Sequence, residues 1–141
     1  MDHVAIMKTG WNMIPKILSG QKTIESRWYQ AKRAPWGKIK TGDTVYFKNS
    51  GEMVTAKAIV SKVLQCTIAD ISEAEAIIKK YGKKICLPND NFVVWHPVPK
   101  YCILIFLQNS TLVKKPFHIN KKGFGMPAAW LTVENIRTIK I

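Results

Sequence analysis

The most informative stretch of this chain is GQKTIESR, residues 20–27, which reads G-x-K-x-x-E-x-R. Three charged side chains within six positions are unusual for a strand. In a regular strand Glu25 and Arg27 share one face, whereas Ile24 points to the other face. Lys22 lies three positions before Glu25, so it joins that face only if it belongs to a loop that precedes the strand.

The spacing of Glu25 and Arg27 is compatible with two arrangements. The two side chains can form an exposed ion pair on the rim of a barrel, which would contribute only about 0–1 kcal/mol to stability. Alternatively, they are held together with Lys22 in a polar cleft, where they would contact a ligand. Spacing by itself does not choose between these arrangements.

The neighbouring segments predict a helix, a strand and a loop around this stretch. The helix has Asn12 as its N-cap, Pro15 in its first turn and Gly20 just after its end. The apolar stripe of this helix consists of Trp11, Ile14, Ile17 and Leu18. Residues 22–28 are then predicted as a strand, and residues 30–40 as a basic loop.

Strand patterns dominate the rest of the chain. Alternating or continuous apolar residues predict strands over residues 3–8, 44–48, 53–63, 101–107, 114–119 and 136–141. Turns and irregular segments are expected at residues 41–43, 49–51, 88–99 and 121–127, with an apolar return at 128–133. The segment 88–99 is expected to hold a helical turn carrying Phe92, Val93 and Trp95.

One longer helix is predicted in the middle of the chain. It begins at a capping box formed by Ser72 and Glu75, runs to about Tyr81 and ends at Gly82. Many strands with few helices predict an α+β fold, namely a mixed β-barrel with a few peripheral helices. Neither a linker nor an internal repeat interrupts the pattern, so residues 1–141 are predicted to form a single domain.

The net charge favours a polyanionic partner. Lys and Arg total 22 against 9 acidic residues, which gives a formal charge of +13 and a pI of about 9.8. Such a basic balance is typical of nucleic-acid-binding domains. An anionic membrane surface fits less well, because the sequence predicts no long basic amphipathic helix.

Composition also excludes several classes of protein. The longest apolar run, residues 102–107, is too short to span a bilayer. The first residues show no secretory signal, and the three cysteines form no C-x-x-C motif, so we expect a cytoplasmic protein without disulfides. His3, His96 and His118 lack metal-ligand spacing to other side chains, so we predict no metal and no cofactor.

Residues 17–28, ILSGQKTIESRW, closely resemble the signature of the ASCH domain, whose hallmark is G-x-K-x-x-E-x-R. Further agreement lies in residues 42–43 with the following strand 45–48, in the buried strand 103–106 and in residues 129–131. The resemblance covers about residues 3–140 and is greatest to the stand-alone bacterial or archaeal type. It implies a PUA-like β-barrel, similar to PUA, YTH and EVE domains, some of which read modified bases.

One branch of this family hydrolyses N4-acetylcytidine, with a Lys at the position of Lys22 and a Thr nucleophile at the position of Glu25. The resemblance therefore makes Lys22 and Glu25 the candidate catalytic residues. A glutamate cannot replace a threonine hydroxyl as the attacking group in amide hydrolysis, and Thr23 lies two residues earlier. The substitution favours a binding module over an enzyme of this branch.

The resemblance implies a cleft that is lined by the signature residues and suited to RNA. Arg27 suits bidentate contacts to phosphate or a base edge, and Lys acts as a point charge. Readers of RNA stack unpaired bases on aromatic faces, which the basic loop offers next to its cations. The predicted nucleic-acid-binding residues are Lys22, Glu25, Arg27, Trp28, Tyr29, Lys32, Arg33, Trp36, Lys48, Asn49, Ser50 and Trp130.

Several of these residues have a structural alternative. Trp28 can pack in the core, Trp130 can face the core with one edge exposed, and Asn49 with Ser50 can serve only as turn residues. Three functions therefore stay open. The favoured one is an RNA-binding module, and the others are a hydrolase acting on a modified nucleoside or on RNA, and a non-catalytic interaction protein whose charge keeps it soluble.

Overall fold

The computed structural model describes residues 1–87 and 97–141. These residues form a six-stranded sheet in the order β2-β5-β4-β3-β1-β6, together with two α-helices. The strands are Asp2–Met7 (β1), Ile24–Tyr29 (β2), Thr44–Asn49 (β3), Val54–Thr67 (β4), Tyr101–Phe117 (β5) and Trp130–Val133 (β6). The helices are Met13–Ser19 (α1) and Ile71–Ile85 (α2). The helical turn expected at Phe92, Val93 and Trp95, and also His96, lie outside the described residues.

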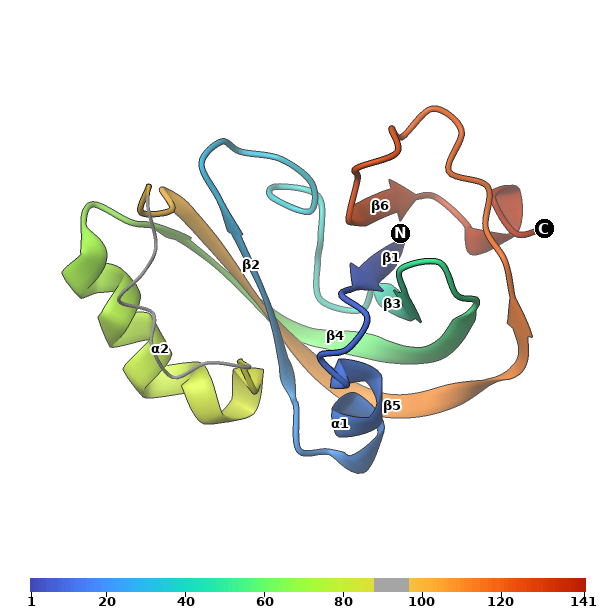
Figure 1. Cartoon of the computed structure of the whole chain (residues 1–141), viewed down its shortest axis with the longest axis horizontal. Coiled ribbons are helices and arrows are strands. Elements are labelled where there is room, and N and C mark those ends of the chain that lie inside the picture. The colour runs from blue at the N-terminus through green and yellow to red at the C-terminus, as the bar shows by residue number, and fades with distance from the viewer. Residues whose placement is uncertain (88–96) are drawn as a thin grey trace.

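The sheet curls into a half-barrel, with α2 beside β2 at one end and the termini at the other (Figure 1). β1 pairs in parallel with β3, and every other neighbouring pair is antiparallel. A parallel pair within an otherwise antiparallel sheet makes the sheet mixed. This architecture confirms the predicted α+β class and the excess of strands over helices.

β5 is one continuous strand, although the sequence predicts two strands over residues 101–107 and 114–119. The polar residues between them do not end the strand. They form a bulge opposite β4, in which Asn109 has the left-handed φ of 53°. A second shift of register occurs near Pro116, which has no N–H to donate to the ladder. Because bulges bend a strand, the 17 residues of β5 can follow the curled sheet.

The C-terminal segment is not the strand that its alternating pattern predicts over residues 136–141. Ile136–Thr138 form a 3-10 helix, whose Ile136 N–H donates to the Asp2 carboxylate of β1 at 2.7 Å, and an isolated bridge pairs Lys140 with Ile119 just after β5. Residues three apart share a face in a 3-10 helix, and Ile136 and Ile139 are both buried. The Asn135 side chain accepts a hydrogen bond from the Arg137 N–H, which starts this turn.

α1 lies where the sequence places it but uses different contacts. Asn12 occupies the N-cap position with a left-handed φ of 57°, and its side chain does not cap the helix. Trp11 is 41% exposed, and Met13 is buried in its place. Gly20 ends the helix as predicted, because its φ of 83° is a conformation that suits glycine.

α2 begins and ends elsewhere than predicted. Its N-cap is Asp70, whose carboxylate accepts from the Glu73 N–H at 3.1 Å, while the Glu73 carboxylate accepts from the Ala69 N–H at 2.7 Å. The capping box therefore lies two residues before the predicted one. The helix continues through Gly82 to Ile85, and its C-cap is Cys86, which takes the left-handed φ of 56°. Among the described helices, none is long and apolar enough to cross a membrane.

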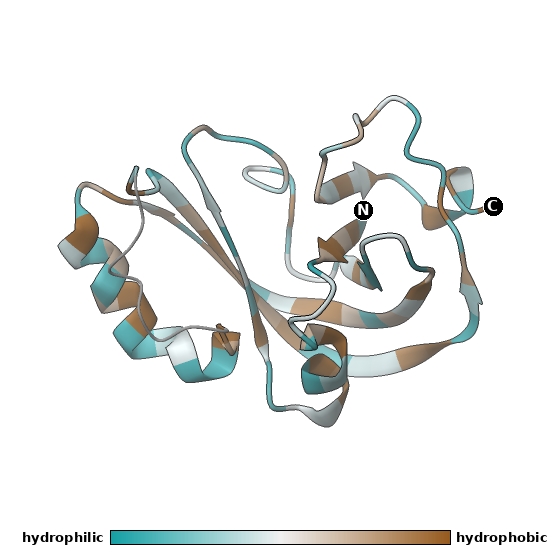
Figure 2. Ribbon diagram, in the orientation of Figure 1, coloured by the Kyte–Doolittle hydropathy of each residue, from teal (hydrophilic) through white to brown (hydrophobic). Residues whose placement is uncertain are grey.

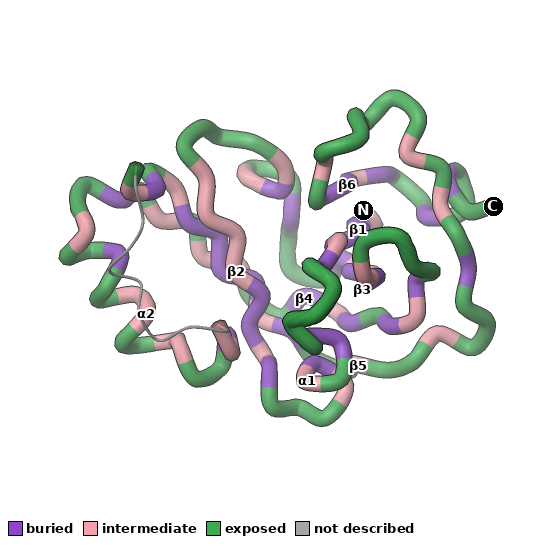
Figure 3. The backbone as a smooth tube through the Cα atoms, in the orientation of Figure 1, coloured by how far each residue is buried: buried purple, intermediate pink, exposed green. Residues whose placement is uncertain are grey.

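Buried side chains lie on both faces of the sheet, because consecutive residues of a strand point to opposite faces and both Val4 and Ala5 of β1 and residues 102–105 of β5 are buried (Figure 3). One cluster packs α1 against the central strands, a second lies under the C-terminal 3-10 helix, and a third joins α2 to β2 and β5. Hydrophobic and hydrophilic residues alternate along α2, whose apolar side contributes to the third cluster (Figure 2). α2 is thus anchored to the edge strand β2.

We predict that Asp70→Ala lowers the free energy of unfolding by about 1 kcal/mol, because it removes the N-cap of α2. Ser72→Ala is the matched control, since Ser72 lies in the first turn and changes stability by less than about 0.5 kcal/mol. Urea denaturation of both variants measures the difference. A larger effect at Ser72 than at Asp70 would contradict the observed start of the helix.

Candidate nucleic-acid interface

Lys22 lies in the short loop between α1 and β2, which is the condition under which it joins Glu25. Its side chain is 2% exposed. The ammonium donates to the backbone carbonyl of Ile24 at 3.0 Å and to that of Ile85, and it lies 3.4 Å from the Glu25 carboxylate. Ile85 is the last residue of α2, so Lys22 places a cation at the negative end of that helix.

Glu25 is buried between Lys22 and Arg27, and we call these three residues the Lys22–Glu25–Arg27 cluster. The Arg27 guanidinium lies 3.4 Å from the second carboxylate oxygen, on the face of β2 that alternation predicts. Burial disfavours the charged form of Glu25, but the charges of Lys22 and Arg27 outweigh it and hold the pKa of the carboxyl below its usual value. The cluster is therefore a buried ion triad rather than an exposed pair.

Arg27 extends the cluster towards β6. Its guanidinium donates to the Ala129 carbonyl at 3.2 Å and lies over the Trp130 ring, 5.1 Å from the centroid. It also lies within 3.4 Å of the Ile6 carbonyl of β1. The Arg27 side chain therefore connects β2 with β1 and with the start of β6. This arrangement fixes the position of the Trp130 ring.

Trp130 is held from its other side by a buried histidine. Its indole N–H donates to His3 Nδ1 at 3.1 Å, so the other ring nitrogen carries the proton and donates to Asp43 at 2.8 Å. The Thr132 hydroxyl lies 3.1 Å from the same Nδ1. Burial lowers the pKa of His3, although the Asp43 carboxylate opposes this shift. His3 is therefore a neutral support for Trp130.

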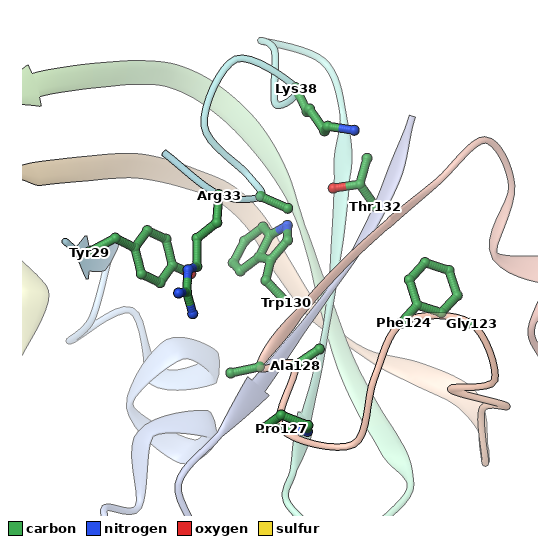
Figure 4. A pocket seen from close by; sticks show the side chains of 11 residues that line it. Tyr29, Arg33, Lys38, Gly123, Phe124, Pro127, Ala128, Trp130 and Thr132 are labelled. Carbon is green, nitrogen blue, oxygen red and sulfur yellow. The ribbon is translucent and has the colours of Figure 1, made fainter. Parts of the chain in front are cut away.

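A pocket of about 510 Å³ opens in front of Trp130. It lies between the 30–40 loop and the loop formed by residues 121–129, which precedes β6 (Figure 4). Lys121 stabilises the second loop, because its ammonium donates to the carbonyls of Met126 and Ala128, both at 2.9 Å. The pocket is lined by Tyr29, Arg33, Ala34, Lys38, Gly123, Phe124, Pro127, Ala128, Ala129, Trp130 and Thr132.

Cations lie on aromatic rings along the 30–40 loop, with Arg33 and Tyr29 at the pocket and Lys32 next to it. Arg33 stacks on the Tyr29 ring at 5.5 Å, and its side chain runs beside that ring in Figure 4. Lys32 lies 5.7 Å from the ring centroids of both Trp36 and Tyr101, which meet edge to face. Burial raises the pKa of Tyr29 against the influence of the neighbouring guanidiniums, so its hydroxyl stays protonated at neutral pH. The rim thus presents neutral aromatic faces together with exposed positive charge.

The structure does not bring all the predicted binding residues together. Lys48 is buried on the other face of β3, where burial and then the charge of Lys121 lower its pKa. Asn49 and Ser50 form the turn between β3 and β4, and the Asn49 amide donates to Glu52. Trp28 packs against the cluster under α2 and donates to the Ser26 hydroxyl. These four residues, and also Lys32 and Trp36 of the 30–40 loop, are not among the described residues that line the pocket, whereas Tyr29, Arg33 and Trp130 are.

Sequence reasoning missed several residues that shape the pocket, namely His3, Asp43, Phe124 and Thr132. His3 and Asp43 are 40 residues apart and carry no spacing that links them. Phe124 lies in a loop predicted only from its glycines. Among the described residues, no group of three or more His, Cys, Asp or Glu side chains could hold a metal ion.

Comparison with known proteins supports the fold. The chain aligns with the crystal structure of ASCH from Zymomonas mobilis with a TM-score of 0.60 at 17% identity, over 97% of this chain and 90% of that chain. A point variant of the same protein gives a TM-score of 0.64 at 16% identity, over 97% and 93% of the two chains. No family model and no curated protein matches the sequence. The chain therefore has the ASCH-type, PUA-like fold that the signature resemblance implies.

We predict that Lys22→Ala lowers the free energy of unfolding by about 3–5 kcal/mol, because it breaks a buried ion triad and leaves a helix-terminal carbonyl without its donor. Lys84→Ala, an exposed lysine at the same end of α2, should change it by less than about 0.5 kcal/mol. Urea denaturation measures both. Near-equal stabilities would show that the buried ammonium is dispensable.

The lowered pKa of His3 predicts a specific pH dependence of stability. The unfolded chain takes up a proton near the ordinary pKa of 6.5, and the folded chain does so only at lower pH. Stability should therefore fall as the pH drops from about 6.5 to 5, by at most about 1.4 kcal/mol per pH unit. Glu25 and Asp43 have pKa values lowered from 4.5 and 3.8, so they contribute below this window.

Denaturation at pH 7 and pH 5 tests this dependence. His3→Gln should reduce the difference in stability between the two pH values. His118→Gln, at an exposed histidine, should leave it unchanged. An identical pH difference in wild type and His3→Gln would assign the dependence to another group.

Proposed function

We propose that this protein binds RNA and holds one unstacked nucleotide in the pocket between the 30–40 loop and the 121–129 loop. The observation that carries this proposal is the coincidence of aromatic faces and exposed cations at a pocket of ligand size. Pockets for small ligands have volumes of about 300–1,000 Å³, and this one has about 510 Å³.

The cations of the rim are available to phosphate groups. Lys32, Arg33 and Lys38 are exposed, and none of them forms an ion pair with a described carboxylate. Arg33 offers a planar set of donors, which matches two phosphate oxygens or the edge of a base. The formal charge of +13 adds long-range attraction for a polyanion.

The aromatic groups of the pocket suit a base that has left its stack. Phe124 is 36% exposed at the pocket, and Trp130 lies deeper, with only 5% exposed. In Figure 4 the Phe124 ring projects from the 121–129 loop, opposite the side chains of the 30–40 loop. Stacking of a base on an aromatic ring contributes about 1–3 kcal/mol and tolerates any base. Hydrogen bonds from Thr132 and Lys38 would add selectivity.

The proposed binding site is the pocket and not the charged segment at residues 20–27, where the sequence predicts the cleft. Lys22, Glu25 and Arg27 are not among the described residues that line the pocket; they lie behind it and position Trp130. The three donor positions of the Lys22 ammonium already face three acceptors. This favours binding over a hydrolysis in which Lys22 would act as a free catalytic group.

Titration of short single-stranded RNA at several salt concentrations tests the proposal. Log K should fall with log salt by about 0.7 per phosphate contacted. Arg33→Ala should weaken binding and reduce this slope by about 0.7 if Arg33 contacts one phosphate. Arg137→Ala removes an exposed arginine from the C-terminal 3-10 helix and is the matched control.

Phe124→Ala should weaken binding by about fivefold or more, because it removes a stacking surface. Trp11→Ala, which removes an exposed aromatic ring outside the pocket, should leave the affinity unchanged. The proposal is wrong if wild type binds no RNA at low salt, or if each variant matches its control. Lys22→Ala is unsuitable for this purpose, since loss of binding would then report loss of stability.

A further inference from the structure

We infer that the basic face of α2 is a second RNA-contact surface, which holds the strand that flanks the nucleotide in the pocket; this inference rests on the proposed function. Four exposed lysines lie on the C-terminal half of α2 within an arc of one helix face. They are Lys79, Lys80, Lys83 and Lys84. The acidic residues Glu73 and Glu75 are confined to the start of the helix.

The helix dipole does not account for all four lysines of the basic face. Lysines in the last turn interact favourably with the helix dipole, and this accounts for Lys83 and Lys84. Lys79 and Lys80 lie one turn earlier. No described carboxylate forms an ion pair with any of the four, so their charge faces solvent without compensation. An uncompensated row of this kind attracts a polyanion.

Aromatic rings accompany these lysines, as they do at the pocket rim. Tyr81 of α2 and Phe106 of β5 meet edge to face, with ring centroids 5.8 Å apart. Lys80 lies 5.4 Å from the Tyr81 ring, and Lys62 of β4 lies 5.4 Å from the Phe106 ring. Both rings are partly exposed. Proteins that bind single-stranded nucleic acid combine cations for the phosphates with exposed aromatic rings for the bases.

The two surfaces are rigidly connected. The end of α2 is joined to the start of β2 by the hydrogen bonds from Lys22 to Ile85 and from the Thr23 N–H to the Lys84 carbonyl. β2 then runs from there to Tyr29 at the pocket. Its six residues, at about 3.3 Å each, separate the two surfaces by about 20 Å. A stacked strand rises about 3.4 Å per nucleotide, so about six nucleotides bridge this distance.

The separation predicts that affinity depends on RNA length. A single-stranded 3-mer fills the pocket alone, whereas a 12-mer reaches both surfaces. The test variant carries Lys79→Ala, Lys80→Ala, Lys83→Ala and Lys84→Ala, and alanine preserves the helix. The control variant carries Lys8→Ala, Lys57→Ala, Lys114→Ala and Lys115→Ala, all at exposed lysines elsewhere. Each variant lowers the formal charge by four, from +13 to +9.

Both variants and wild type are titrated with the two RNA lengths at several salt concentrations. If all four lysines contact phosphates, the salt slope of the 12-mer should fall by about 2.8 in the test variant, at about 0.7 per contact. The slope of the 3-mer should not change, and the control variant should resemble wild type with both lengths. Tyr81→Leu, which keeps the apolar packing, should weaken binding of the 12-mer alone.

Equal losses in the two quadruple variants would overturn the inference, because they would show a nonspecific effect of net charge. An unchanged 12-mer slope in the test variant would also overturn it, and would leave a different polyanion, such as an acidic protein, for this face. Failure of the pocket proposal is distinguishable, because it appears in the 3-mer and in Arg33→Ala rather than in the α2 variant.

Discussion

The buried carboxylate of Glu25 is the constraint on which the rest of the structure depends. A buried charge is costly unless it is paired, and Glu25 is paired with Lys22 on one side and Arg27 on the other. Each cation then uses its remaining donors elsewhere. Lys22 bonds to the end of α2, and Arg27 bonds to the segment before β6. One carboxylate therefore ties together parts of the chain that lie more than 100 residues apart.

Local geometry is the part of this arrangement that the sequence predicts. Glu25 and Arg27 share a face because side chains alternate along a strand. The sequence predicts the strand from residue 22, which would turn Lys22 away from that face; β2 instead begins at Ile24, and Lys22 reaches Glu25 from the loop after Gly20. The ASCH-type fold is also predictable, since the charged segment and the strand pattern both indicate it. The helix before the segment and the basic loop after it are likewise local features.

Features that depend on distant contacts escape the sequence. Asp70 and Ser72 both satisfy a capping pattern with an acid three residues later, and propensity cannot choose between them. β5 continues through its polar centre because β4 offers a partner along its whole length. The neutral histidine that bonds to Trp130 depends on Asp43, which lies 40 residues later in the sequence, just before β3. The pocket depends on a loop that is distant in sequence from the charged segment. Each of these requires the tertiary structure.

The two hydrogen bonds from Lys121 across its own loop have a thermodynamic consequence. Fixing one backbone residue costs about 1–2 kcal/mol of conformational entropy, and a glycine-containing loop has more of it to lose. The hydrogen bonds from the Lys121 ammonium to the carbonyls of Met126 and Ala128 hold the two ends of this loop together. Much of this entropy is therefore lost on folding and not on association. A ligand that enters beside Phe124 meets a preorganised wall, and its binding free energy is correspondingly less opposed.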